Sequence, residues 1–387
     1  MNFLSKIFNF SRGFSQKIQT LNHIYISKEA ILSNFDVIQS LNPWKSIFPV
    51  LKSNAYWHGI TQVASILKER KLDYIVVDSY YEALKVWEVN PVKILLIGYM
   101  LEENLSKMNF KKIDLVVYDT QIIHALGKLR KKVNIHIKVD TGMNRQWVFP
   151  YELKDFLKVV KKYKNIQIIW ICTHLADSDN AKNEYSQMQL WRFEHALDIL
   201  KSEKIFPKYV HLSNSWGSLK DFWAGSVNSV RLWVSLYGVN PLAETDTAYK
   251  KAQKLRLALD FETTLIQKKL IKKWEKVWYN GSFEAPQDML IGVVPVGYFE
   301  ALPRSLSNNY TLYFGKKPLP IIGKVCMNLC MIDLTQAPAT HVWDKISVIS
   351  WDILSKNTLY HLAKKSQTIP YEVMVKLNES VRREITK

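Results

Sequence analysis

Apolar and polar positions alternate in blocks along the first two thirds of the chain, with short apolar runs followed by longer stretches of helical spacing. The short runs predict eight strands, at Phe48–Lys52, Tyr74–Asp78, Ile94–Gly98, Leu115–Asp119, Ile135–Asp140, Ile166–His174, Tyr209–Ser215 and Val230–Gly238. Several are almost continuously apolar, which is typical of parallel strands buried on both faces. Amphipathic stretches between them predict helices, for example at Thr120–Lys132, Tyr151–Tyr163 and Asn183–Lys204.

Eight strands in strict alternation with helices predict an α/β fold of the closed (β/α)₈ type, a TIM-type barrel. An open, doubly wound sheet is the alternative. That fold normally carries a glycine-rich phosphate loop after its first strand, and no such loop follows Phe48–Lys52.

The pattern changes after about residue 262, where short strands separated by turn residues replace the alternation. Strands are expected at Met289–Gly297, Tyr310–Phe314, Pro320–Cys326, Cys330–Leu334 and Lys345–Ile349, and a helix at Thr358–Ser366. This pattern predicts a second, mostly antiparallel β domain. We therefore expect an N-terminal extension at residues 1–20, a barrel at 21–262 and a β domain at 263–387.

Composition narrows the classes of function. The 387 residues carry a net charge of +18, but the lysines are spread over many predicted helix faces and no nucleic-acid-binding signature is present. No run of eighteen apolar residues occurs, and residues 1–16 lack the apolar core of a signal peptide. The three cysteines have no zinc-ligand spacing, so no metal site is expected, and they fit a reducing cytoplasm. We expect no nucleic acid and no membrane among the partners.

The active site of such a barrel lies where the strands end at their carboxyl side, so the residues at those ends are the candidates for chemistry. They are Lys52, Lys138, Asp140, Arg145, His174, Asn214, Ser215 and Arg231. Each has an ordinary structural explanation alone, such as a salt bridge for Arg231 or a buried histidine for His174. Together they predict a cationic mouth suited to an anionic cofactor and a carboxylate substrate.

Several motifs occur in the order and spacing of the alanine racemase family. The first is Lys52-Ser-Asn-Ala-Tyr56-Trp-His-Gly, and the barrel continues with Lys138-Val-Asp-Thr-Gly-Met-Asn-Arg145, Thr173-His174-Leu-Ala, His211-Leu-Ser-Asn-Ser215 and Val230-Arg231. Pro295-Val-Gly-Tyr298, Gly323-Lys-Val-Cys-Met327 and Pro370-Tyr371-Glu-Val resemble the family's second domain. The resemblance runs from about Ile24 to the end of the chain.

This resemblance implies a pyridoxal 5'-phosphate-dependent isomerase that interconverts L-alanine and D-alanine (EC 5.1.1.1). Lys52 would hold the cofactor and act as a base on one face of the substrate Cα, and Tyr298 would act on the other face. In the family that tyrosine comes from the partner in a head-to-tail homodimer. The implied product, D-alanine, serves peptidoglycan synthesis in the cytoplasm.

The resemblance also implies roles for the remaining candidates. Arg231 would face the pyridine nitrogen and temper the electron sink, and His174 would orient Arg231 or the ring. Tyr56, Ser215 and Tyr371 resemble the phosphate ligands, and Asn214 lies beside them. Arg145 and the backbone amide of Met327 would hold the substrate carboxylate. Lys138 matches a position that is often carbamylated.

The sequence departs from the family where tryptophan replaces an expected glycine, at Trp57, Trp147, Trp170, Trp233, Trp274, Trp278 and Trp343. Glycine permits positive φ and close backbone approach, whereas an indole does neither. Because the codon UGA is read as glycine in some bacterial lineages and as tryptophan in others, we hypothesise that these positions are glycine. A degenerate, inactive homologue is the rival interpretation.

Milder departures are Asn328, where aspartate is common, and Phe299-Glu300-Ala301 after Tyr298. They leave open a racemase for serine or for a basic amino acid. A barrel decarboxylase would need a catalytic cysteine and aspartate in its β domain, in a context that Cys326 and Cys330 lack. A small cofactor-carrying barrel protein would lack the β domain altogether.

Overall fold

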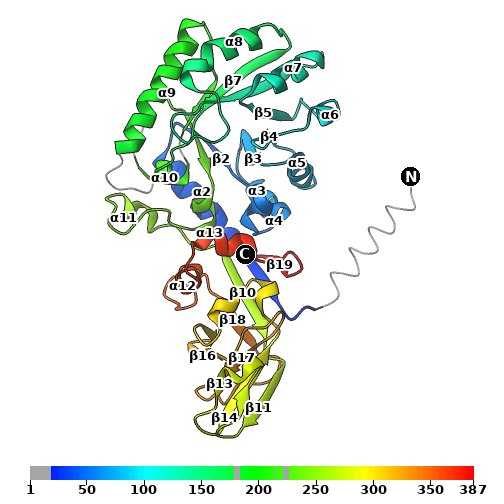
Figure 1. Cartoon of the computed structure of the whole chain (residues 1–387), viewed down its shortest axis with the longest axis vertical. Helices are drawn as coiled ribbons and strands as arrows, with labels where there is room; N and C mark the ends of the chain where they lie inside the picture. Colours follow the sequence, from blue (N-terminus) through cyan, green and yellow to red (C-terminus); the bar gives the residue numbers. More distant parts are fainter. Residues whose placement is uncertain (1–18, 178–183, 213, 221–225) are drawn as a thin grey trace, which may run out of the picture. The chain divides into compact units, whose positions relative to one another are not determined.

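The computed structural model describes residues 19–177, 184–212, 214–220 and 226–387. It divides into two compact units, one formed by residues 27–258 and the other by 19–26 together with 259–385. Most of the expected N-terminal extension lies outside the described residues. Figure 1 labels the elements of both units.

The first unit is a barrel of parallel strands. Its strands are β2 (Ser46–Pro49), β3 (Tyr74–Val77), β4 (Lys93–Leu96), β5 (Ile113–Val117), β6 (Val133–Lys138), β7 (Ile166–Cys172), β8 (Tyr209–His211) and β9 (Ser229–Leu232). Strands β3 to β8 pair in sequence order, and β2 pairs with β9. A bridge between Val50 and Val76 joins β2 to β3. The N–H of Asn228 donates to the carbonyl of Val210 over 3.1 Å and joins β8 to β9. These links close the ring and confirm the barrel.

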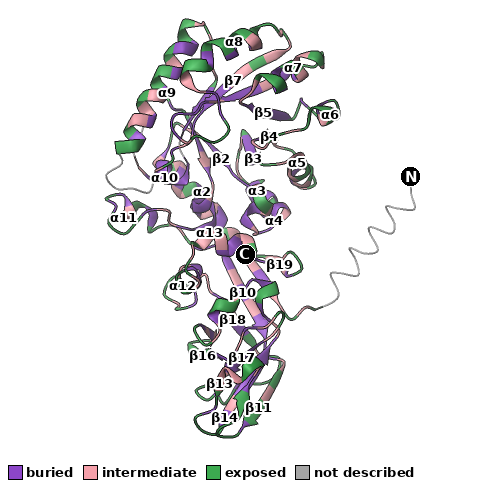
Figure 2. Ribbon diagram, viewed as in Figure 1, coloured by how far each residue is buried: buried purple, intermediate pink, exposed green. Residues whose placement is uncertain are grey.

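Helices cover the outside of the barrel. They are α2 (Lys28–Leu41), α4 (Ile60–Leu67), α5 (Tyr80–Trp87), α6 (Glu102–Leu105), α7 (Thr120–Lys128), α8 (Leu153–Lys161), α9 (Glu184–Ser202), α10 (Ser215–Leu219) and α11 (Tyr249–Ala252). The helical spacing of α8 places Leu153, Phe156, Leu157 and Val160 on its buried face. In Figure 2 strands β3 and β5 are buried, and the outer helices expose one face.

Aromatic rings and one buried carboxylate fill the inside of the barrel. The ring centroid of Trp170 lies 4.0 Å from that of His136 and 4.4 Å from that of Phe48. Asp114, fully buried, accepts hydrogen bonds from Tyr74 Oη and from Asn134 Nδ2, the latter over 3.1 Å. Burial lowers the pKa of His136 to about 4, so its imidazole is neutral and Lys93, 3.8 Å from Asp114, supplies the opposite charge.

The second unit is a nine-stranded sheet with a small hairpin of β12 (Lys276–Val277) and β13 (Phe283–Glu284). The sheet contains β1 (His23–Ser27), β10 (Leu259–Thr264), β11 (Gln267–Ile271), β14 (Met289–Val294), β15 (Thr311–Phe314), β16 (Lys317–Ile322), β17 (Cys330–Asp333), β18 (Lys345–Ile349) and β19 (Arg382–Thr386). The pairs β1–β10, β10–β18, β11–β14, β14–β17, β15–β16, β15–β18 and β16–β17 are antiparallel. Helices α12 (Leu359–Lys365) and α13 (Pro370–Lys376) follow. The antiparallel β domain is thus confirmed.

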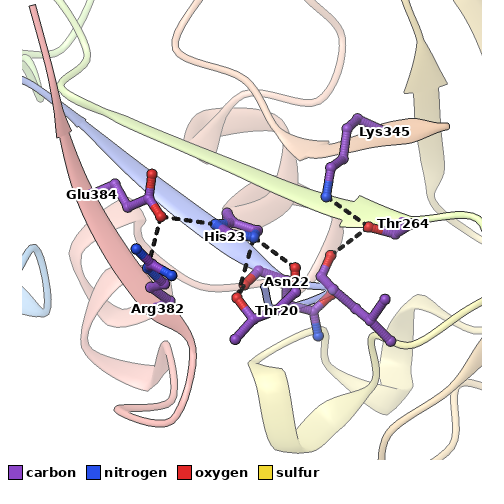
Figure 3. A network of polar contacts seen from close by, with 8 residues as sticks. Thr20, Asn22, His23, Thr264, Lys345, Arg382 and Glu384 are labelled. Carbon is purple, nitrogen blue, oxygen red and sulfur yellow. Dashed lines mark hydrogen bonds and ion pairs between the residues drawn. The ribbon is translucent and has the colours of Figure 1, made fainter. Parts of the chain in front are cut away.

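Polar contacts join the described N-terminal residues to strands from the far end of the chain (Figure 3). Nδ1 of His23 lies 3.4 Å from Oε1 of Glu384, and Nε of Arg382 lies 2.7 Å from the same carboxylate oxygen. Oγ1 of Thr264 donates to the carbonyl of Leu21 over 2.7 Å and lies 2.9 Å from Nζ of Lys345. Strand β1 therefore belongs with the sheet of the second unit, although the barrel follows it directly in the sequence.

Several predicted strands are longer than those observed. The strand expected at Val230–Gly238 ends at Leu232, and the short 3₁₀-helix η2 (Val234–Tyr237) follows. The strand expected to include Lys52 ends at Pro49, and a left-handed segment begins at Ser53. Within the described residues, no helix combines the length and the apolar character that crossing a membrane requires.

Candidate active site in the barrel

A cavity of about 240 Å³ lies at the carboxyl ends of the barrel strands. Seven of the residues expected from the sequence line it, namely Lys52, Tyr56, Lys138, Arg145, His174, Asn214 and Arg231. Its apolar wall includes Val50, Val76, Ile97 and Val116. The alternation of strands and helices thus brings together polar side chains that are spread over about 180 residues of sequence.

The cavity is strongly cationic. Lys52, Lys138, Arg145 and Arg231 line it, and no aspartate or glutamate is among the described lining residues. A cluster of like charges in a partly enclosed, low-dielectric space is costly unless an anion binds there. The lining therefore fits a ligand with phosphate and carboxylate groups.

Lys52 opens a left-handed turn, α3 (Lys52–Tyr56). The φ angles of Ser53, Asn54, Ala55, Tyr56 and Trp57 are all positive, between 50° and 63°. Left-handed backbone costs about 1–2 kcal/mol per residue for L-amino acids, so neighbouring contacts must hold it. The side chain of Asn54 accepts from the N–H of Ile60 over 2.8 Å, and Glu82 accepts from the N–H of Asn54 over 3.3 Å. The turn places both Lys52 and Tyr56 at the cavity.

Arg231 is held by two imidazoles and by carbonyl groups. Its Nη1 contacts Nδ1 of His211, and its Nη2 lies 3.1 Å from Nδ1 of His174 and 2.9 Å from the carbonyl of Thr173. Burial, followed by the charge of Arg231, holds the pKa of both histidines well below 6.5. Because a guanidinium only donates, each neutral imidazole accepts at Nδ1. Burial also lowers the pKa of Arg231, but the group stays charged at neutral pH.

Lys138, the last residue of β6, is a half-buried lysine with an unusual environment. Burial lowers the pKa of its ammonium group to about 8, and the charges of Arg145, Arg231 and Lys52 act in the same direction. Its Nζ lies 4.4 Å from the ring centroid of Trp147, and the guanidinium carbon of Arg145 lies 5.5 Å from the same centroid. An amine with this pKa is partly neutral near pH 7 and able to act as a nucleophile.

The loop that carries Arg145 is organised around Asp140. The Asp140 carboxylate accepts hydrogen bonds from the N–H groups of Gly142, Asn144 and Arg145, over 2.8, 3.0 and 3.1 Å. Charge-assisted bonds of this kind are strong, so they fix where the Arg145 backbone leaves the strand. Oη of Tyr185 on α9 donates to the carbonyl of Gly142 over 2.6 Å and holds the loop from outside.

Two backbone N–H groups converge on the buried hydroxyl of Ser215, which is not itself part of the cavity lining. Oγ of Ser215 accepts from the N–H of Trp233 over 2.9 Å and from the N–H of Ser235 over 3.3 Å. Asn214 caps α10 through Oδ1, which accepts from the N–H of Gly217 over 3.0 Å. A hydroxyl beside N–H groups that point at one spot is a favourable environment for a phosphate. Trp233 lines the cavity.

Three expected residues lie in the second unit. Tyr298 and Met327 lie on its surface and are 43% and 56% exposed. The N–H of Tyr298 donates to the carbonyl of Cys326 over 3.0 Å, which makes Tyr298 and Met327 neighbours. Gly297 permits this approach, since a Cβ there would lie 2.2 Å from the carbonyl oxygen of Cys326. Oε1 of Glu300 accepts from Nδ2 of Asn328 over 2.9 Å and braces the same turn. Tyr371 is in the first turn of α13.

The sequence interpretation gave no role to His211 and Cys172, which also line the cavity. His211 is the last residue of β8 and contacts Arg231, and Cys172 is the last residue of β7. Burial raises the pKa of the Cys172 thiol, so it stays neutral. Both lie inside the predicted strands Ile166–His174 and Tyr209–Ser215, in apolar runs that indicate core residues.

The fold is a parallel barrel with a separate β domain, and the barrel contains a cavity whose cationic lining fits an anionic ligand. Comparison with known proteins makes this specific. The family model of the alanine racemase N-terminal domain matches residues 26–241, and that of the C-terminal domain matches residues 258–385. The chain therefore belongs to the alanine racemase family.

Individual relatives agree with this assignment. The alanine racemase of Methanococcus maripaludis is 32% identical over 92% of this chain and 96% of its own length. The structure of alanine racemase from Bacillus anthracis with bound L-Ala-P has a TM-score of 0.86 and 25% identity, and 96% of each chain is covered. That from E. faecalis has a TM-score of 0.84 and 28% identity over 95% of this chain and 98% of that chain.

Proposed function

We propose that this protein interconverts L-alanine and D-alanine with pyridoxal 5'-phosphate as cofactor, and that the barrel cavity is its catalytic site. The observation that carries the proposal is the set of four cations, Lys52, Lys138, Arg145 and Arg231, around a cavity whose described lining has no carboxylate. Membership of the alanine racemase family supports it.

The residues present fit this cofactor. Lys52 would hold it covalently, while Tyr56, Asn214, Ser215 and Tyr371 would hold its phosphate. When bound, pyridoxal phosphate supplies an electron sink that makes the Cα–H bond of an amino acid acidic. Arg231 would keep a fixed positive charge next to the ring, because two neutral imidazoles and backbone carbonyls hold its guanidinium. His174 would keep that guanidinium in orientation.

Arg145 and the Met327 backbone amide would bind the substrate carboxylate. The amine of Lys52, freed when the substrate amine takes its place on the cofactor, would remove or return the Cα proton on one face, and the phenol oxygen of Tyr298 would do so on the other. Racemisation needs proton transfer on both faces, and one group cannot reach both without turning the substrate over. We propose that Tyr298 reaches the cavity of a second copy in a head-to-tail homodimer, which fits its 43% exposure beside Met327.

We also propose that Lys138 forms a carbamate with carbon dioxide. The lowered pKa, about 8, supplies the neutral amine that this reaction needs. The product is an anion, and Arg145 is the adjacent cation that would pair with it. The change from cation to anion would also reduce the repulsion among the four positive groups in the cavity.

Racemisation by purified protein tests the proposal. We expect L- and D-alanine to interconvert when pyridoxal phosphate is supplied, and we expect no conversion by Lys52→Ala. The exposed surface lysine Lys68 offers a matched control, so Lys68→Ala should retain full activity. Serine, lysine and arginine assayed alongside would identify a different substrate, and cofactor binding with no racemisation of any amino acid would refute the proposal.

A further inference from the structure

Four tryptophans have backbone angles that suit glycine. The φ angles of Trp57, Trp274, Trp278 and Trp343 are 63°, 72°, 60° and 81°. Positive φ is rare for any residue with a side chain and is a clear outlier for a bulky one. No other tryptophan in the described ranges has a positive φ. Trp57 ends a left-handed segment whose other residues, from Ser53 onward, are not glycine either, so its φ angle does not single out glycine. The argument for glycine therefore rests on the other three positions.

Trp274 and Trp343 occupy the same position in two similar turns. The N–H of Glu275 donates to the carbonyl of Lys272 over 3.0 Å, and the N–H of Asp344 donates to that of His341 over 3.1 Å. Each tryptophan is therefore the third residue of a four-residue turn. A positive φ at that position alone defines a type II turn, which normally requires glycine there.

The backbone of these turns cannot relax easily, because the N–H group of each tryptophan also donates to a carbonyl outside the turn. The N–H of Trp274 donates to the carbonyl of Ala285 over 2.8 Å, and the N–H of Trp343 donates to that of Leu265 over 2.7 Å. The indoles gain little in return, since the two residues are 65% and 67% exposed. The contact of Lys273 Nζ with the Trp274 ring, 4.5 Å from its centroid, is on the surface.

Trp278 has a backbone conformation that is more restricted still. Its φ of 60° and ψ of −166° fall in a region that is populated almost only by glycine. Its indole Nε1 is buried and has no hydrogen-bond partner among the described residues. A buried indole N–H normally donates to an acceptor. Tryptophan therefore suits neither the backbone angles of position 278 nor the polar groups around its indole.

From these angles and turns, we infer that glycine, not tryptophan, occupies positions 274, 278 and 343 in the protein that the cell makes, through reading of UGA as glycine. The chain has 13 tryptophans beside 13 glycines, as such a misassigned codon would produce. Positions 147, 170 and 233 have negative φ, so the backbone angles support glycine only at positions 274, 278 and 343. The inference does not depend on the proposed activity, because it concerns the backbone alone.

The codons and the natural protein test this inference directly. We expect UGA at positions 274, 278 and 343, and UGG at Trp44 and Trp87, whose φ angles are not positive. Peptide mass spectrometry of the protein purified from its own cells should find glycine at the three positions. UGG codons there, or peptides that contain tryptophan, would overturn the inference.

A stability measurement on recombinant protein gives an independent test. We expect Trp343→Gly to raise the Tm, because a strained turn is relieved and an exposed ring is lost. Trp44→Gly is the matched control, since Trp44 is 93% exposed but lacks a positive φ, and it should leave the Tm unchanged or lower it. Equal or lower Tm for Trp343→Gly would count against glycine at this position, whatever the catalytic activity of the protein.

Discussion

Nη2 of Arg231 lies 3.1 Å from Nδ1 of His174, and the histidine accepts this hydrogen bond as a neutral imidazole. Together with the contact between Nη1 and His211, it fixes both arms of a half-buried guanidinium. A planar fork with two fixed arms is a more rigid source of charge than an ammonium group on a flexible stem.

We therefore expect Arg231→Lys to fold but to lose much of its activity. A lysine cannot donate to both imidazoles and the carbonyl of Thr173 in the same geometry. Removal of one preorganised electrostatic contact of this kind typically reduces kcat on the order of 10²-fold. Steady-state kinetics with a circular dichroism control would measure this, and an unchanged kcat would show that the orientation of the guanidinium is unimportant.

Asp140 is expected to act on substrate binding through Arg145. In Asp140→Ala, the loop loses the acceptor for three backbone N–H groups, at a cost on the order of 3 kcal/mol in stability. The backbone of Arg145 is then no longer held in place, so KM for alanine should rise by about tenfold, equivalent to about 1.4 kcal/mol of binding free energy, with a smaller change in kcat. Denaturant unfolding and steady-state kinetics measure the two effects, and a fall in kcat with KM unchanged would contradict this role.

Lys138 should give a pH-dependent carbamate. With a pKa of about 8, the amine is about one tenth neutral at pH 7 and mostly neutral at pH 9. We expect the carbamate resonance in ¹³C-bicarbonate NMR to grow across this range and to be absent from Lys138→Arg. A carbamate resonance of constant intensity between pH 7 and pH 9 would contradict the lowered pKa of Lys138.

The same lysine should make stability depend on pH. Its folded pKa of about 8 is below the ordinary value of 10.5, so the unfolded chain binds more protons between these values. Without bicarbonate, the free energy of unfolding should therefore rise as the pH increases from about 8 to 10.5. Comparison with Lys138→Met isolates this effect, and an identical pH dependence in the two proteins would contradict the lowered pKa.

Tyr298→Phe should separate cofactor binding from catalysis. The substitution removes one oxygen from an exposed surface residue, so the fold and the cofactor absorbance should persist. Loss of a positioned acid–base group typically reduces the rate about 10²- to 10⁴-fold. Racemisation followed from both enantiomers, with cofactor absorbance as the control, measures this loss. Near-normal racemisation in both directions would assign the second base to another residue.

Much of the barrel was predictable from the sequence, because buried parallel strands are apolar throughout and helices separate them. Lys138, His174 and Arg231 were found for the same reason, since each polar residue interrupts or ends an apolar run. The left-handed turn after Lys52 was not predictable. Its φ angles are positive from Ser53 to Trp57 without a single glycine, and local propensity gives no signal for such a segment.

The pairing of strands that are far apart in the sequence could not be predicted either. Strand β1 is short and pairs with β10, more than 230 residues away in the sequence, so no local pattern indicates that it belongs to the sheet domain. The contact of His211 with Arg231 was not predicted because His211 lies inside a predicted strand, in a run that indicates core residues. The tryptophan positions show the opposite case, in which the sequence raised the hypothesis and the φ angles of Trp274, Trp278 and Trp343 support it.

The central claim is that Lys52 holds the cofactor in the barrel cavity. Borohydride reduction of the protein loaded with pyridoxal phosphate, followed by peptide mass spectrometry, tests it most directly. We predict one modified residue, Lys52, and no label in Lys52→Ala. Label at Lys138 or on surface lysines alone, with Lys52 unmodified, would contradict the claim.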